Sequence, residues 1–208
     1  MKLSSLTGLF NCRMPSYFII YKPYHTLSQF SSQDDKKCLK DYFQVGKDVY
    51  PVGRLDYDSE GLLILTNDSS LNHRLLNPGF LHEREYWVQV EGDISASSLE
   101  HIQEGVEINI NGKEYTTLPC KASRFRQPPR VPERIPPIRF RKNVPTSWIR
   151  LVLTEGKNRQ VRKMTAALGY PTLRLIRHRI EKLELGDMKP GEMRLLSREL
   201  IYQKLFGK

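Results

Sequence analysis

The run Leu62–Leu65, four consecutive aliphatic residues, constrains the fold of this chain more than any other stretch. It is too short for a free-standing helix, and an unbroken apolar run of this length is typical of a strand buried on both faces. The segment before it, 53–61, places one arginine and three carboxylates between two glycines, which permit sharp backbone turns. The sequence therefore predicts a charged loop anchored by a buried strand, and loops of this kind commonly carry catalytic residues.

Three interpretations of this loop compete. It can be an ordinary solvated turn, or it can present a catalytic aspartate, Asp56, with Arg54 nearby. The pattern D-x-D-x-E-G at 56–61 also imitates the start of a calcium-binding EF-hand loop. The calcium interpretation fails because Asn67 stands where the bidentate glutamate belongs, and because the flanks are strand-like rather than helical. We therefore predict no metal site.

The charge of the chain points to a polyanionic partner. Its 208 residues include 33 basic and 23 acidic side chains, a net charge of +10, which favours nucleic acid first and an anionic membrane second. Simple solubility is the alternative. No apolar run is long enough to span a bilayer. The three cysteines lack metal or redox spacing, so we expect free thiols in a reducing, cytoplasmic setting. Residues 1–15 are expected to form a loose tail.

Periodicity and capping signals predict a mixture of short strands and helices. Asn67-Asp68, Ser95, Asn158 and Ser197 are the expected helix N-caps. In 86–90, Tyr86 shares one face with the valines, and Trp87 points the other way. The expected strands are 17–21, 62–65, 86–90, 106–110, 148–153 and 173–176, with a last strand within 186–196; the expected helices are 69–76, 95–104, 159–168 and one after 197, with a short helix near 36–43.

The segment 124–145 differs from the rest in composition. It holds six prolines and seven basic residues, and proline at that density excludes helix and interior strand. One interpretation is a long disordered insertion. The other is an RNA-gripping arm, because arginine binds phosphates and stacks on bases, and Phe125, Phe140 and Trp148 lie among or beside the charges.

Three motifs, in the same order along the chain, resemble the RsuA family of pseudouridine synthases. They are G-R-L-D with D-S-E-G-L at 53–62, Y-x-V at 86–88, and E-G-K-N-R-Q-V-R-K-M at 155–164; the segment 169–177 fits the same family. The resemblance runs from about 17 to about 195. One departure is Arg84, where the family usually has lysine. The segment 136–148 is similar to the corresponding segment of members that act on large-subunit ribosomal RNA. The chain also leaves no room for an amino-terminal S4-like RNA-binding domain before the catalytic pattern, which is a further similarity to those members.

The resemblance implies an α+β fold: a bent, mixed, mostly antiparallel sheet with packed helices, in two subdomains that flank a catalytic cleft. The catalytic domain would be 16–208. The implied reaction isomerises uridine in RNA to pseudouridine without cofactor or metal, with the target base flipped out of its helix. We expect a monomer acting on ribosomal RNA, with no membrane partner. The implied catalytic residues are Asp56, Tyr86 and Arg162; the implied RNA contacts are Lys22, Arg54, Arg159, Lys163 and Arg177.

By the same resemblance Asp56 attacks or deprotonates the ribose, and the sequence leaves that choice open. Arg162 is the expected cation beside Asp56, with Arg54 second. Lys22 can equally be a surface lysine that closes a strand. We expect Asp58 to shape the loop through backbone hydrogen bonds and Glu60 to pair with a basic residue. The remaining candidates for phosphate contacts are Arg174 and Arg179.

Two other functions remain open at this point. A non-catalytic RNA-binding or ribosome-assembly protein could keep the fold without turnover. A glycoside hydrolase using Asp56 with Glu60 is weaker, because a basic chain with a proline–arginine arm is an odd design for neutral sugars.

Overall fold

The computed structural model describes residues 14–139 and 141–207, so nearly all of the expected tail at 1–15 lies outside it. The strands are β1 (Tyr17–Lys22), β2 (Tyr50–Pro51), β3 (Glu60–Thr66), β4 (Arg84–Glu91), β5 (Glu107–Ile110), β6 (Lys113–Thr116), β7 (Lys121–Arg124), β8 (Thr146–Leu153), β9 (Thr172–Ile180), β10 (Leu183–Glu184) and β11 (Met193–Leu196). The helices are α1 (Ser69–Leu76), α2 (Ala96–Glu104), α3 (Gln160–Ala167) and α4 (Arg198–Phe206), with 3₁₀ turns η1 (Leu39–Asp41) and η2 (Pro78–Phe80).

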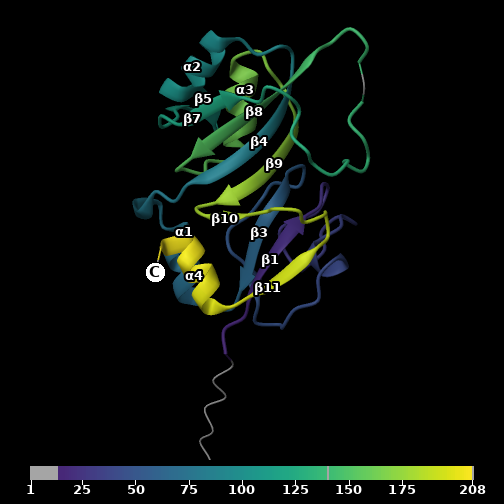
Figure 1. Cartoon of the computed structure of the whole chain (residues 1–208), viewed down its shortest axis with the longest axis vertical. Helices are drawn as coiled ribbons and strands as arrows, with labels where there is room; N and C mark the ends of the chain where they lie inside the picture. Colours follow the sequence, from purple (N-terminus) through teal and green to yellow (C-terminus); the bar gives the residue numbers. More distant parts are fainter. Residues whose placement is uncertain (1–13, 140, 208) are drawn as a thin grey trace, which may run out of the picture.

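One sheet runs through the described residues in the order β11-β1-β3-β9-β4-β8-β7, with β2 beside β3 and β10 beside β9. Every pairing in it is antiparallel except that of β3 with β9. The molecule is elongated, with β1, β3 and β11 in one half and β4, β7 and β8 in the other (Figure 1). The predicted α+β class with a mixed, mostly antiparallel sheet is confirmed.

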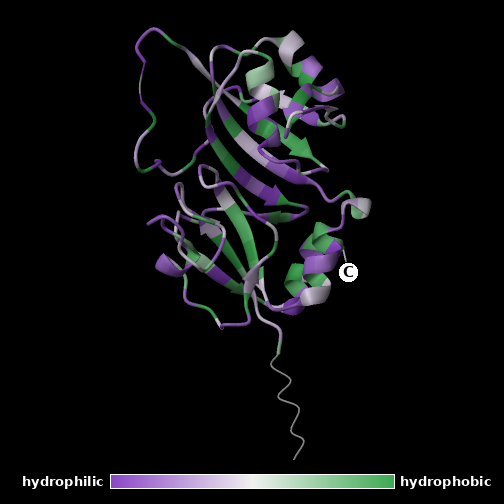
Figure 2. Ribbon diagram, turned by 180° about the vertical axis from the view of Figure 1, so that it is seen from behind, coloured by the Kyte–Doolittle hydropathy of each residue, from purple (hydrophilic) through white to green (hydrophobic). Residues whose placement is uncertain are grey.

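Apolar side chains cover both faces of this sheet. Helices α1 and α4 pack on β1 and β3, while α2 and α3 pack on β4, β8 and β9. The 3₁₀ turn η1 and its neighbours cover the remaining face of β1 and β3. Every residue of β3 is buried, as the aliphatic run predicted, and β3 stands out as an apolar strand in Figure 2.

The two halves of the sheet meet where β3 lies parallel to β9. Gly61 pairs there with Arg177. A Cβ atom on Gly61 would lie 2.3 Å from the carbonyl oxygen of Arg177, and the backbone φ of Gly61 is +109°. Only glycine therefore fits, because both the close approach and the positive φ exclude a side chain. This junction lies at the end of the acidic loop, residues 53–61.

The capping signals were right at three helices and wrong at one. The side chains of Asp68, Ser95 and Ser197 each accept a backbone hydrogen bond at the start of α1, α2 and α4. Asn158 does not cap α3. Arg159 is the N-cap there, with φ of 52° and no side-chain cap bond, and Gln160 instead accepts a hydrogen bond from the backbone of Lys157. The turned backbone at Arg159 directs its guanidinium toward the acidic loop.

The segment 124–145 leaves the sheet between β7 and β8 and returns to it as a long arm, visible as the wide loop in Figure 1. It is not a free insertion: Phe125 and Val131 pack against the core. Arg134 donates to the carbonyl oxygens of Pro136, Leu173 and Pro137, and its guanidinium lies over the ring of Tyr24.

The aromatic residues that lie among or beside these charges make contacts within the protein. Trp148 belongs to the core and is 8% exposed, and Phe125 contacts Trp87 edge to face. Phe140 lies outside the described residues.

Cys38 and Cys120 are free thiols. No helix in the described part of the chain has the length and apolar character needed to cross a membrane.

Candidate active site

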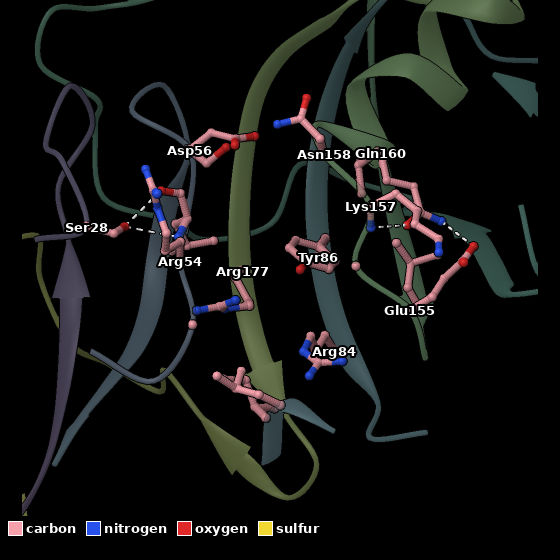
Figure 3. A pocket seen from close by; sticks show the side chains of 18 of the residues that line it. Ser28, Arg54, Asp56, Arg84, Tyr86, Glu155, Lys157, Asn158, Gln160 and Arg177 are labelled. Atoms are coloured by element: carbon pink, nitrogen blue, oxygen red, sulfur yellow. Dashed lines mark hydrogen bonds between the residues drawn. The ribbon is translucent and has the colours of Figure 1, made fainter. Parts of the chain in front are cut away.

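A cleft of about 830 Å³ opens between the two halves of the sheet. Its walls are the acidic loop with the end of α1 on one side, and the loop 153–161 that leads into α3 on the other. Strands β4 and β9 form its floor with Tyr86 and Arg177. Figure 3 shows Asp56, Tyr86 and Arg177 around this one space, each delivered by a different part of the chain. Of the predicted catalytic residues, Asp56 and Tyr86 line the cleft.

The backbone before Asp56 is fixed by Ser28. The Ser28 hydroxyl accepts a hydrogen bond from the backbone N–H of Leu55 at 3.0 Å and donates to the Leu55 carbonyl oxygen at 2.8 Å. Ser28 is 6% exposed, so these bonds are shielded from water. Sequence analysis missed this residue, because a serine in a polar stretch carries no local signal of a contact 27 positions away.

The acid that Arg162 contacts is Asp58, which corrects the expected pairing with Asp56. Arg162 lies 3.3 Å from the Asp58 carboxylate and donates to the Asp58 backbone oxygen at 2.6 Å. Asp56 has Arg159 as its nearest cation, at 3.9 Å. Arg54, the second candidate, lines the cleft without an ion pair among the described residues. Asp58 therefore holds both arginines at the rim, and Asp56 is left open to the cleft.

Asp58 stays ionised for a clear reason. Burial alone would raise the pKa of its carboxyl, but the hydrogen bonds from Arg159 and the charge of Arg162 outweigh burial and hold that pKa below its ordinary value. For Arg162 burial dominates and lowers the guanidinium pKa, with Asp58 opposing the shift. Asp58 shapes the loop mainly through side-chain ion pairs, which differs from the predicted backbone role.

Tyr86 and Arg177 are paired residues on adjacent antiparallel strands, β4 and β9. Pairing places their side chains on the same face, which here is the cleft. Directly after Arg177 the register shifts by a β-bulge, so that Arg179 pairs with Glu85 and turns to the opposite face. Arg179 is thereby removed from the site. Arg177 is only 5% exposed, so it is a buried floor residue rather than a surface phosphate contact.

Two more predicted RNA contacts have buried side chains that bond to other groups of the protein. Arg174 makes a two-point ion pair with Glu60 at 2.8 Å, with both side chains buried. The expected basic partner of Glu60 is thus confirmed, and Arg174 is not available to phosphate. Lys22 is fully buried, and its amine donates to the carbonyl oxygens of Pro23 and Thr26.

Burial lowers the pKa of Lys22 to about 7, with the nearby carboxylates of Glu60, Asp58 and Asp56 opposing the shift. Neither earlier interpretation fits this lysine, because a surface residue or an RNA contact needs solvent access. Lys163 is partly exposed on α3 and makes no side-chain hydrogen bond or ion pair with the described residues.

Glu155 holds the loop 153–161, which forms the far wall of the cleft. Sequence analysis did not identify this residue individually. Glu155 accepts hydrogen bonds from the Tyr115 hydroxyl, the backbone of Leu118 and the side chain of Gln160. These contacts tie the loop 153–161 to the β5–β6 hairpin. Within residues 14–139 and 141–207 no group of three or more histidine, cysteine or acidic side chains could hold a metal ion.

A model of the RNA pseudouridylate synthase family matches residues 16–167, which is more than half of the chain. The chain belongs to the RNA pseudouridylate synthase family. The relatives most similar to this synthase include the ribosomal large subunit pseudouridine synthase E of Vibrio parahaemolyticus, 49% identical over 84% of this chain and 71% of the relative. The synthase E of Xanthomonas campestris is 45% identical over 85% of this chain and 93% of the relative.

A solved structure agrees with this membership. A crystal structure of a pseudouridylate synthase matches with a TM-score of 0.72 and 26% identity, over 92% of this chain and 74% of the other. The expected family fold is therefore confirmed for the described residues.

Proposed function

We propose that this synthase isomerises a specific uridine of large-subunit ribosomal RNA to pseudouridine. The observation that supports the proposal most directly is the cleft, where Asp56 is open to a ligand while the neighbouring Asp58 is occupied by two arginines. The relatives at 45–49% identity carry the name of a large-subunit synthase. The basic charge of +10 suits an RNA substrate.

In this proposal Asp56 acts on the ribose of the target uridine, either by attacking it or by removing a proton from it. Either step uses the carboxylate form of Asp56, and the guanidinium of Arg159 lies 3.9 Å from it. The phenol of Tyr86 offers the flipped base a flat surface and a hydroxyl group. Arg162 acts through Asp58, which it holds at the rim, rather than through a direct bond to Asp56.

The RNA would approach over the rim of the cleft and along the arm. Arg126, Arg130 and Arg139 are exposed and make no side-chain hydrogen bond or ion pair with the described residues, so they are free to bind phosphates. Arg54 and Lys163 are the corresponding candidates at the cleft and on α3. We expect the synthase to act as a cytoplasmic monomer, without cofactor or metal.

The test is nucleotide-resolution mapping of pseudouridine in large-subunit RNA after incubation with the protein. Wild type should form pseudouridine at one site, and Asp56→Asn should lose that product while still binding the RNA. Asp187→Asn is the matched control, because Asp187 is an exposed acid outside the cleft. RNA binding without product from wild type would favour the non-catalytic binder, and full activity of Asp56→Asn would remove Asp56 from the mechanism.

A further inference from the structure

Arg177 is a buried cation without a counter-charge. Its Nε donates to the Leu62 carbonyl oxygen at 2.8 Å, while its Nη2 has no hydrogen-bond partner among the described residues. No carboxylate in the described part of the chain forms an ion pair with it, in contrast to Arg174 on the same strand, which holds Glu60. Burying an unpaired charge costs free energy, so an unsatisfied guanidinium in a folded protein requires an explanation.

The position of Arg177 suggests that explanation. It lies on the floor of the cleft. In the sheet it pairs with Tyr86 on one side and with Gly61, at the end of the acidic loop, on the other. Figure 3 shows its side chain beside Tyr86 and, in this view, below Asp56 and Arg54. Arg84 adds a second charge nearby, and within the described part of the chain its guanidinium donates only to the carbonyl oxygens of His82 and Leu75. The acids sit at the rim, so the floor carries uncompensated positive charge.

The proposed reaction, on which this inference rests, generates a negative charge at this place. Breaking the bond between C1′ and N1 leaves the electron pair on the base, and the uracil anion spreads that charge over N1 and its two carbonyl oxygens. If Asp56 attacks, an oxygen–C1′ bond forms as the C1′–N1 bond breaks. If Asp56 removes the C2′ proton, a C1′=C2′ double bond forms instead. The base departs with the electron pair in both routes.

We propose that Arg177 is a catalytic residue that binds the detached uracil through a carbonyl oxygen and stabilises its anion until the new bond forms. The base then turns, and C5 bonds to C1′. In the first route the carboxylate is released, and in the second the proton returns to C2′. C5 loses its proton and N1 gains one, so no co-reactant is consumed. Arg177 keeps its own proton throughout and acts by charge, because a fixed and largely buried donor binds the anion better than the neutral base.

The test compares Arg177→Gln, Arg177→Lys and Arg177→Ala with wild type in single-turnover reactions at saturating RNA. Removal of one fixed donor to a developing anion lowers the rate about 10²–10³-fold, so Arg177→Gln should lose that much with unchanged RNA affinity. Arg177→Lys should retain an intermediate rate. Arg194→Gln is the matched control, because it removes an arginine charge from an exposed site outside the cleft.

Chemical rescue distinguishes loss of the Arg177 positive charge from loss of the folded structure. Guanidinium chloride at low concentration should partly restore Arg177→Ala, and sodium chloride at equal ionic strength should not. Undiminished turnover in Arg177→Gln, or the absence of guanidinium rescue in a folded Arg177→Ala, overturns the inference. Failure of all three variants to fold, seen by thermal unfolding, assigns Arg177 a structural role and also overturns it. Absence of product from wild type would instead overturn the proposed function itself.

Discussion

The guanidinium of Arg159 and the carboxylate of Asp58, 101 positions apart in the chain, form a two-point ion pair with distances of 2.9 and 2.8 Å. This pair joins the acidic loop to the start of α3, across the mouth of the cleft. It brings Arg159 within 3.9 Å of Asp56. The geometry around the proposed catalytic acid therefore depends on its neighbour, Asp58.

Asp58→Asn should lower turnover about 10–10²-fold, because Arg159 and Arg162 lose the carboxylate that positions them and small displacements at a reacting centre are costly. Single-turnover assays with saturating RNA would show the loss in the chemical step. Asp187→Asn, an exposed acid paired with Arg194, should leave the rate unchanged. A wild-type rate in Asp58→Asn would show that the ion pairs at the rim do not position Asp56.

Lys22 should make folding stability depend on pH. Burial lowers the pKa of its amine in the folded protein to about 7, below the value of about 10.4 in an unfolded chain. The unfolded state binds more protons between these values, so the free energy of unfolding should rise as pH increases from about 7 to about 10. Lys22→Met should remove this contribution.

Urea unfolding of wild type and Lys22→Met across that pH range measures the effect. Lys189→Gln, which alters an exposed lysine, should retain the wild-type pH dependence. Equal pH dependence in wild type and Lys22→Met would contradict the assignment.

Loss of one partner of the buried Glu60–Arg174 ion pair should lower the free energy of unfolding far more than loss of both partners. Glu60→Gln leaves the buried guanidinium without its counter-charge and should cost about 3–5 kcal/mol of unfolding free energy. The double variant Glu60→Leu with Arg174→Met should cost much less, because it buries no unpaired charge. Chemical denaturation of the single and double variants provides the comparison, and equal destabilisation by both would count against it.

Gly61→Ala should destabilise the junction between the two halves of the sheet. Gly112→Ala is the matched control, because Gly112 also has positive φ but nothing lies within 4 Å of the added Cβ. Backbone strain is common to both, so the excess in Gly61→Ala reports the clash with Arg177 and should be about 1–3 kcal/mol or more. Thermal or denaturant unfolding gives the difference, and equal losses would show that the strands separate to accept the methyl group.

The sequence by itself determined the local elements and the residue types of the site. The aliphatic run at 62–65 predicted a buried strand. Asp68, Ser95 and Ser197 marked their helices because a capping side chain bonds within a few residues of itself. The motifs around Asp56, Tyr86 and Arg162 were also visible, and the first two line the cleft that the fold creates.

Only the tertiary structure decided which charges meet. Arg174, Arg177 and Arg179 look alike in the sequence, but the register of β9 buries the first against Glu60 and the second beneath the cleft. A β-bulge turns the third to the opposite face. Ion-pair partners such as Asp58 and Arg159 likewise come from segments about one hundred residues apart. Such pairings depend on strand register and loop packing, which the pattern of a single segment does not contain.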